Sequence, residues 1–151
     1  MRSQINKLFF LSLLALTCSF MTAPVAAQDS AEEAAVREAL GFYIQGHATG
    51  NREIMARAFH PEAHLTFIEP DGSLRTISLE QFLSGMSGRP APDEDQRIRT
   101  IEWVDVGGTT AVGKIVLDYP TIHFVDYMSL HKVDGEWKIV HKSYHRELKG
   151  S

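Results

Sequence analysis

The feature that most constrains the fold is a series of four apolar segments in the last third of the chain. Short turn signals separate them, and the segments are Ile98–Val106, Thr109–Tyr119, Ile122–Val133 and Glu136–His145. Gly107-Gly108 and Asp134-Gly135 lie between the members of each pair, and such two-residue links favour β-hairpins. The sequence therefore predicts a curled antiparallel meander.

The first half of the chain is predicted to be mainly helical. Ser30 and Glu33 form a capping-box pattern before a helix that has apolar residues and a tyrosine at helical spacing up to Gly50. Asn51 can cap a second short helix, which Pro61 ends, and Ser78 can cap a third over Leu79–Met86. Two further strands, His64–Glu69 and Ser73–Ile77, flank the turn Pro70-Asp71-Gly72. Helices followed by a meander indicate an α+β fold with the helices on one face of the sheet.

The extreme N-terminus reads as a secretory signal peptide. Arg2 and Lys7 precede an apolar stretch, and the small residues of Val25-Ala26-Ala27 predict cleavage after Ala27. We therefore expect residues 28–151 to form a single domain that is periplasmic or secreted. Cys18 would leave with the leader, so the mature domain must be held together by its core without disulfides.

The charge balance of the predicted mature chain excludes some classes of partner. Removal of residues 1–27 leaves 13 basic residues against 19 acidic ones, and no basic cluster is visible. This acidic balance argues against nucleic acid and, after cleavage, against an anionic membrane as the main partner.

Asp126 is the anomalous residue of the predicted strand Ile122–Val133. A lone carboxylate inside an apolar strand is costly to bury unless it is paired or protonated. The next strand ends in the polar series His141, Ser143 and His145, so the two strands predict a pocket floor with ionisable groups.

Three segments of the sequence form a pattern together: Tyr43 with Gly50 at the end of the first helix, the run Ala58–Ala63, and the hairpin Asp126–Val140. In these segments the chain resembles the nuclear transport factor 2-like superfamily. Within the superfamily the chain is most similar to the lumazine-binding and SnoaL-like branches. The resemblance implies a cone-shaped curved sheet, of the cystatin-like roll type, wrapped by three N-terminal helices around a pocket. It also implies a homodimer through the sheet, but no particular reaction, because this scaffold carries enzymes and binders alike.

The resemblance extends to ketosteroid isomerase, in which a tyrosine and a protonated aspartic acid donate hydrogen bonds to an enolate oxygen. Tyr43 and Asp126 stand at the matching places, although a purely structural Tyr–Asp contact is an equal alternative. The base of that enzyme matches a position near Phe67, which cannot act as a base. Glu69 lies two residues later, where it could line the pocket mouth or simply be solvated.

The histidines offer a second set of proton carriers. Strict alternation along the last strand places Trp137, His141 and His145 on one face, and Lys142 and Tyr144 on the opposite, more solvated one. His141 and His145 would then line the pocket and could shuttle a proton, unless they only bond backbone or lie at a dimer surface. Phe67, Trp103, Met128 and Trp137 are expected to form its apolar wall, as ligand-binding or core residues.

No metal site or cofactor is expected. His141 and His145 are four residues apart on a strand, which separates their side chains by about 13 Å. Pro61 stands between His60 and His64, so helical ligation by that pair is not available.

Three functions remain open on the sequence. The first is an exported protein that binds a largely apolar small molecule in the cone, with polar contacts from Tyr43, Asp126, His141 and His145. The second is a lyase or isomerase that transfers a proton at carbon, with a histidine or Glu69 as base. The third is a non-catalytic dimeric interaction domain. The loop Gly85–Gln96 could serve as a lid or be a plain surface loop.

Overall fold

The computed structural model describes residues 25–150, which contain three α-helices, one short 3-10 helix and six strands. In chain order these are α1 (Val25–Thr49), α2 (Arg52–Ala58), β1 (Phe59–Ile68), β2 (Leu74–Ser78), α3 (Leu79–Ser84), η1 (Glu94–Gln96), β3 (Ile98–Gly107), β4 (Thr110–Asp118), β5 (Ile122–Val133) and β6 (Glu136–Leu148).

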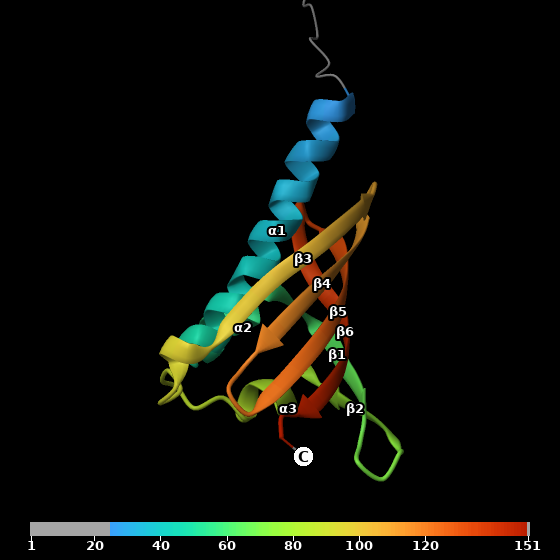
Figure 1. Cartoon of the computed structure of the whole chain (residues 1–151). Helices are drawn as coiled ribbons and strands as arrows, with labels where there is room; N and C mark the ends of the chain where they lie inside the picture. The colour runs from blue at the N-terminus through green and yellow to red at the C-terminus, as the bar shows by residue number, and fades with distance from the viewer. Residues whose placement is uncertain (1–24, 151) are drawn as a thin grey trace, which may run out of the picture.

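The six strands form one curved sheet in the order β2-β1-β6-β5-β4-β3. All neighbours are antiparallel except β1 and β6, which run parallel. α1 runs along the concave side of this sheet, with α2 and α3 at its lower end (Figure 1). Val36, Leu40 and Tyr43 of α1 are completely buried and belong to the main core cluster. The predicted α+β class and the cone-like wrapping of helices around the sheet are confirmed.

Local sequence signals explain most element boundaries. The side chain of Asn51 accepts a hydrogen bond from the backbone N–H of Ile54 and caps α2. Ser78 and Gln81 form a reciprocal capping box at the start of α3. Asp134 and Gly135 both have positive φ, as a type I′ hairpin turn requires.

The first two helices differ from the prediction at their ends. α1 begins at Val25 rather than at Ser30, because the alanines and glutamine before Ser30 are compatible with helix. α2 ends at Ala58, and Phe59 and Pro61 belong to β1 instead. The pairing of β1 with β6 jumps from Phe59 to His64, so Pro61, which has no N–H to donate, lies in the irregular part of the strand.

The predicted signal peptide lies almost entirely outside the described residues. Cleavage after Ala27 would remove the first three residues of α1. Within residues 25–150 no helix combines the length and the apolar character that a membrane crossing requires.

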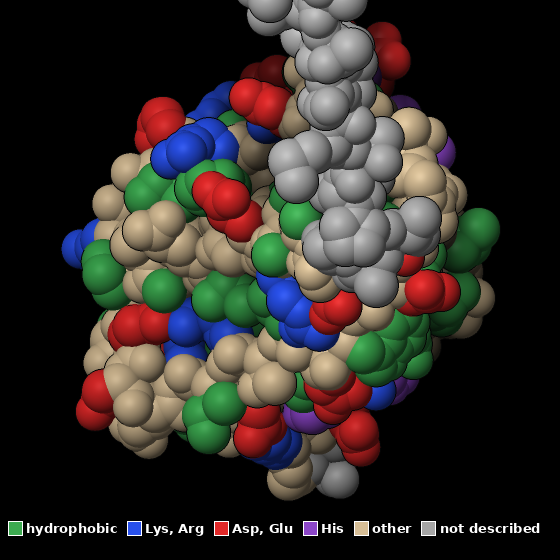
Figure 2. Space-filling view, turned by 90° about the horizontal axis from the view of Figure 1, so that it is seen from above, with side chains coloured by type: hydrophobic (Ala, Val, Ile, Leu, Met, Phe, Trp, Pro, Cys, Tyr) green, Lys and Arg blue, Asp and Glu red, His purple; other side chains and the backbone are tan. Residues whose placement is uncertain are grey.

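Charges of both signs are mixed on the surface. Figure 2 shows acidic and basic side chains interspersed on the face seen from above, without a single-sign patch. Most surface charges are also paired with neighbours, as in Arg37–Glu33 and Lys114–Glu102. This face therefore offers no basic stripe of the kind that binds nucleic acid.

Candidate functional site

A hydrogen-bonded triad of Tyr43, Asp126 and Lys142 lies inside the curve of the sheet. The hydroxyl of Tyr43 donates to Oδ2 of Asp126 at 2.5 Å, and Nζ of Lys142 donates to the same hydroxyl at 2.5 Å. Nζ also lies 3.0 Å from Oδ2 of Asp126. Asp126 and Tyr43 are 0 % exposed and Lys142 is 3 % exposed. The predicted contact between Tyr43 and Asp126 is present, and a third partner joins it.

A β-bulge brings Lys142 into the triad. β5 pairs Ser129 with His141 but Leu130 with Ile139, which leaves Val140 as an extra residue in β6. An extra residue exchanges the two faces of a strand beyond that point. Trp137 and Ile139 face the core before the bulge, and Lys142 and Tyr144 face it afterwards.

The bulge corrects the predicted face of the last strand. His141 and His145 do not share the face of Trp137. Nε2 of His141 instead lies 3.0 Å from Oγ1 of Thr66 on the outer side of the sheet, and His145 is exposed. Lys142, which strict alternation assigns to the solvated face, is buried. The sequence feature that could have pointed to Lys142 is Asp126, because a buried carboxylate needs a cation on a neighbouring strand.

The triad also changes the expected role of Asp126. Tyr43 donates to it and Lys142 pairs with it, so Asp126 acts as an acceptor in this arrangement. The oxyanion-donor role that the isomerase precedent implies requires the opposite direction. Removal of Lys142 from water lowers its pKa from the usual value, although the nearby Asp126 opposes this change. Burial, and then the charge of Asp126, raises the pKa of Tyr43 well above its usual value.

Two buried polar atoms beside Tyr43 have no hydrogen-bond partner among the described residues. They are Oδ1 of Asp126 and Nε2 of His47. The ring of His47 stands edge-on to that of Tyr43 at 4.6 Å, and burial lowers the pKa of His47 well below its usual value. Because buried polar groups are normally paired, these atoms mark a place where a ligand or water can bind.

Aromatic rings continue from the triad toward the end of the sheet. Nζ of Lys142 lies 4.5 Å from the ring centre of Tyr144, which stacks on Phe67 at 4.8 Å and approaches Phe124 at 6.3 Å. Met128 pairs with Lys142 across the strands and is buried. The structure thus places the predicted wall residues Phe67 and Met128 on the same inner face as the triad.

An open pocket of about 600 Å³ lies at that end of the sheet. Glu69, Arg146 and the exposed ends of β1 and β6 surround it; the lining residues are Ile68, Glu69, Pro70, Ile122, His145, Arg146 and Leu148. Glu69 forms ion pairs with Arg75 at 2.8 Å and with Arg146 at 3.0 Å. Glu69 therefore does lie at a pocket mouth, but these two partners occupy its carboxylate.

The two tryptophans lie in different environments. Trp103 is 40 % exposed on the outer face of the sheet, where its ring lies 6.5 Å from that of Tyr127. Its predicted place in the inner wall is wrong, because a register shift after Ile101 turns it outward. Trp137 is buried, and its indole N–H donates to Glu32 at 2.8 Å, far along β6 from the triad.

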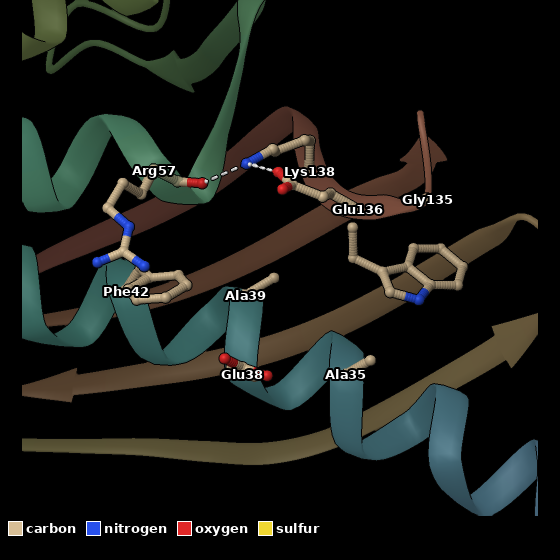
Figure 3. A pocket seen from close by; sticks show the side chains of 9 residues that line it. Ala35, Glu38, Ala39, Phe42, Arg57, Gly135, Glu136 and Lys138 are labelled. Atoms are coloured by element: carbon tan, nitrogen blue, oxygen red, sulfur yellow. Dashed lines mark hydrogen bonds and ion pairs between the residues drawn. The ribbon is translucent and has the colours of Figure 1, made fainter.

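A second hollow, of about 430 Å³, lies between α1 and the β5–β6 turn (Figure 3). Arg57 covers the ring of Phe42 at 3.9 Å, and Lys138 bridges the carbonyl of Arg57 and the carboxylate of Glu136. Ala35 and Ala39 form its small-residue side. No member of the triad lines this hollow or the larger pocket. Residues 25–150 contain no group of three or more histidines, cysteines and carboxylates placed to hold a metal ion.

Comparison with protein families gives a match over most of the chain. The family model described as "Putative lumazine-binding" matches residues 31–145. A curated relative, Aldolase FrzH from a Cladobotryum species, is 24% identical over 106 residues, which are 68% of this chain and 82% of the relative.

Solved structures give the same fold. A nuclear transport factor 2-like protein of unknown function from Shewanella baltica superposes with a TM-score of 0.71 at 27% identity, over 78% of this chain and 95% of that one. The CaMKII hub of S. rosetta superposes with a TM-score of 0.54 at 20% identity, over 76% of this chain and 96% of the hub.

Proposed function

This chain belongs to the lumazine-binding family of nuclear transport factor 2-like proteins, and on that premise we propose that it binds a largely apolar small molecule inside the curve of its sheet. The ligand would lie against Phe67, Phe124 and Tyr144, with a polar group directed at the triad. The fold alone leaves the ligand open, so the proposal depends on the chemistry of the triad.

The observation that carries the proposal is the unused hydrogen-bonding capacity of the triad. A lysine ammonium has three donors, and Lys142 uses two of them on Tyr43 and Asp126. Among residues 25–150, Oδ1 of Asp126 is a buried acceptor without a hydrogen-bond partner. One donor beside one acceptor suits a ligand that carries a carbonyl oxygen next to an N–H or O–H group.

The pocket at the end of the sheet is the route we propose for this ligand. Its Arg146 lies over the ring of Phe67 at 5.5 Å, and Phe67 stacks on Tyr144, which contacts Lys142. This succession of rings supports binding of a planar apolar body between the mouth and the triad.

The second candidate function is an enzyme that acts at carbon beside a carbonyl group. It is favoured by the combination of an amine, a phenol and a carboxylate within 3.0 Å of one another. The relative named an aldolase supports the same chemistry, because an aldolase makes or breaks a carbon–carbon bond next to a carbonyl.

Export and dimerisation complete the proposal. The leader pattern of residues 1–27 supports a periplasmic or secreted location. Exposed apolar side chains on the outer face of the sheet, namely Trp103, Val112 and Tyr127, support a homodimer through that face. A hub among the structural neighbours is consistent with assembly through this scaffold.

Native mass spectrometry tests these points together. The full chain would be expressed with residues 1–27 and purified from the exported fraction of its own host. We expect the mass of a chain that begins at Gln28 and a complex of two such chains. We also expect a co-purifying small molecule that is absent from the Asp126→Asn variant. The control is His141→Gln on the outer face, which should retain the molecule. A small molecule held equally by wild type and Asp126→Asn, or none at all, would refute binding at the triad.

The dimer has its own test in sedimentation velocity. Tyr127→Lys places a charge in the centre of the exposed apolar face and should give a monomer. Leu74→Lys changes an exposed residue of β2 elsewhere and should leave the dimer intact. Equal sedimentation of Tyr127→Lys and wild type would place the interface on another surface.

A further inference from the structure

Lys142 differs from every other described lysine in its surroundings. Lys142 is buried, whereas the side chains of Lys114, Lys132, Lys138 and Lys149 remain partly exposed. Rings of Tyr43, Phe82 and Tyr144 lie 4.9, 5.7 and 4.5 Å from its nitrogen. A primary amine is thus enclosed by aromatic rings and contacts two proton carriers.

We propose that Lys142 forms an imine with an aldehyde or ketone bound in the cone, so that the site takes carbonyl compounds as covalent ligands or substrates. The proposal rests on the ligand-binding function proposed above and adds the chemical class of the ligand. It depends on the geometry of the triad, in which the amine, a phenol and a carboxylate meet.

An amine must lose a proton before it can attack a carbonyl, and the triad provides the acceptor. Oδ2 of Asp126 lies 3.0 Å from Nζ and can receive that proton. Burial of Lys142 favours the neutral amine, as in other lysines that react with carbonyl groups. Tyr43, at 2.5 Å from both Nζ and Oδ2, can pass a proton between the carboxyl group and the carbonyl oxygen.

The step balances without a further reactant. The nitrogen lone pair forms a bond to the carbonyl carbon while the carbon–oxygen π bond breaks, and the oxygen takes a proton from the triad. Two of the three protons of the original ammonium finally leave with this oxygen as water. The product is a protonated imine that keeps the single positive charge beside Asp126. Such an imine acidifies the adjacent C–H bond, which is the property that proton transfer at carbon requires.

The route by which a carbonyl compound would reach the amine runs along the inner face of β6. Lys142, Tyr144 and Arg146 succeed one another on this face, and Arg146 lines the pocket of about 600 Å³. The half-buried ring of Tyr144 therefore stands between the open pocket and the amine. We expect the size of this side chain to limit the rate at which a carbonyl compound reaches Lys142.

Reductive trapping on the full-length mature protein tests the inference. Benzaldehyde and cyanoborohydride near neutral pH convert any imine into a benzylamine, which peptide mass spectrometry assigns to one lysine. We expect Lys142 to be labelled faster than Lys138, because burial lowers the pKa of Lys142 and leaves more of its amine neutral. If the more exposed lysines Lys138 and Lys149 were labelled faster than Lys142, the inference would be overturned.

Two variants separate access from reactivity. Tyr144→Leu should speed labelling of Lys142, while Tyr127→Leu, a tyrosine on the outer face, should leave the rate unchanged. Asp126→Asn should shift the pH profile of labelling, because the amine loses its proton acceptor. Equal rates in Tyr144→Leu and wild type would refute the access route.

A non-covalent measurement distinguishes this inference from the proposed function. Displacement of 8-anilinonaphthalene-1-sulfonate by benzaldehyde without reductant reports binding alone. Saturable displacement without labelling of Lys142 would refute the imine and leave the binding function standing. Absence of both displacement and labelling, in a folded protein, would contradict benzaldehyde-like ligands and the imine together.

Discussion

Nζ of Lys142 lies 3.0 Å from Oδ2 of Asp126 on the adjacent strand, where the register partner of Asp126 is Tyr144, two residues after Lys142. Both side chains are buried, and the hydroxyl of Tyr43 bonds each of them. Neither charge can reach water, so each depends on the other for its compensation. Removal of either residue would therefore leave the other charge buried without its partner.

We first predict strong coupling between the two residues. Lys142→Met leaves the carboxylate of Asp126 buried and unpaired, and should lower the free energy of unfolding by about 3 to 5 kcal/mol. Asp126→Asn should cost a similar amount. The double variant should cost clearly less than the sum, because neither charge remains. Urea denaturation of the four proteins checks this, and additive effects would show that the two charges are independently solvated.

The second prediction concerns stability in mild acid. Desolvation lowers the pKa of the His47 side chain well below its usual value, so His47 stays neutral in the folded protein at pH values where it takes up a proton in the unfolded chain. The unfolded state is therefore favoured as pH falls below about 6.5, by up to about 1.4 kcal/mol per pH unit.

Removal of His47 isolates its contribution. His47→Phe keeps a ring against Tyr43 and should abolish this part of the acid destabilisation, as measured by thermal unfolding between pH 7 and pH 5. His131→Gln removes a histidine of the outer face and should keep the fall. A fall that persists in His47→Phe would assign it to other groups.

Sequence reasoning succeeded where one local signal determines the geometry. The caps Asn51 and Ser78 and the turn Asp134-Gly135 all formed as predicted, because each depends on residues within one turn. The contact of Tyr43 with Asp126 was also predictable, because the family resemblance indicates that the first helix and the strand that carries Asp126 lie next to each other. These signals sufficed for the fold and for one side of the triad.

The rest of the site depends on one extra residue in β6. Nothing in the run Ile139–Lys142 marks Val140 as bulged. The position of the bulge is determined by the strand pairing on both sides of it and not by a preference of the local residues. Strict alternation consequently assigned His141 and His145 to the inner face and Lys142 to solvent. The same limit applies to Trp103, which a register shift in β3 turns outward.

The third prediction concerns the junction between α1 and the loop before β3. Gly50 has a φ of +65°, and its carbonyl accepts a hydrogen bond from the N–H of Gly88 at 3.0 Å. A Cβ on Gly50 would overlap the carbonyl oxygen of Arg89. Gly50→Ala therefore adds a steric clash to backbone strain and should lower stability by at least about 2 kcal/mol. Gly72→Ala, at φ +85° with open space around it, isolates the strain and should cost less. Equal losses in urea denaturation would mean that the loop moves away freely.

The fourth prediction concerns the contact between the β5–β6 hairpin and α1. Glu32 accepts hydrogen bonds from Lys132 at 2.6 Å and from the indole of Trp137 at 2.8 Å, and these bonds, Lys132 first, lower its pKa. The hydrogen bonds of the Glu32 carboxylate stabilise the fold fully at pH values above the ordinary carboxyl pKa. This stabilisation is lost as the pH falls through the lowered pKa of Glu32. The indole N–H resonance of Trp137 should therefore shift on acid titration below pH 4.5, while that of the outward Trp103 stays nearly constant. Glu32→Gln should remove the titration and leave an uncharged acceptor. A Trp137 resonance that titrates unchanged in Glu32→Gln would contradict this contact and assign the shift to another carboxylate.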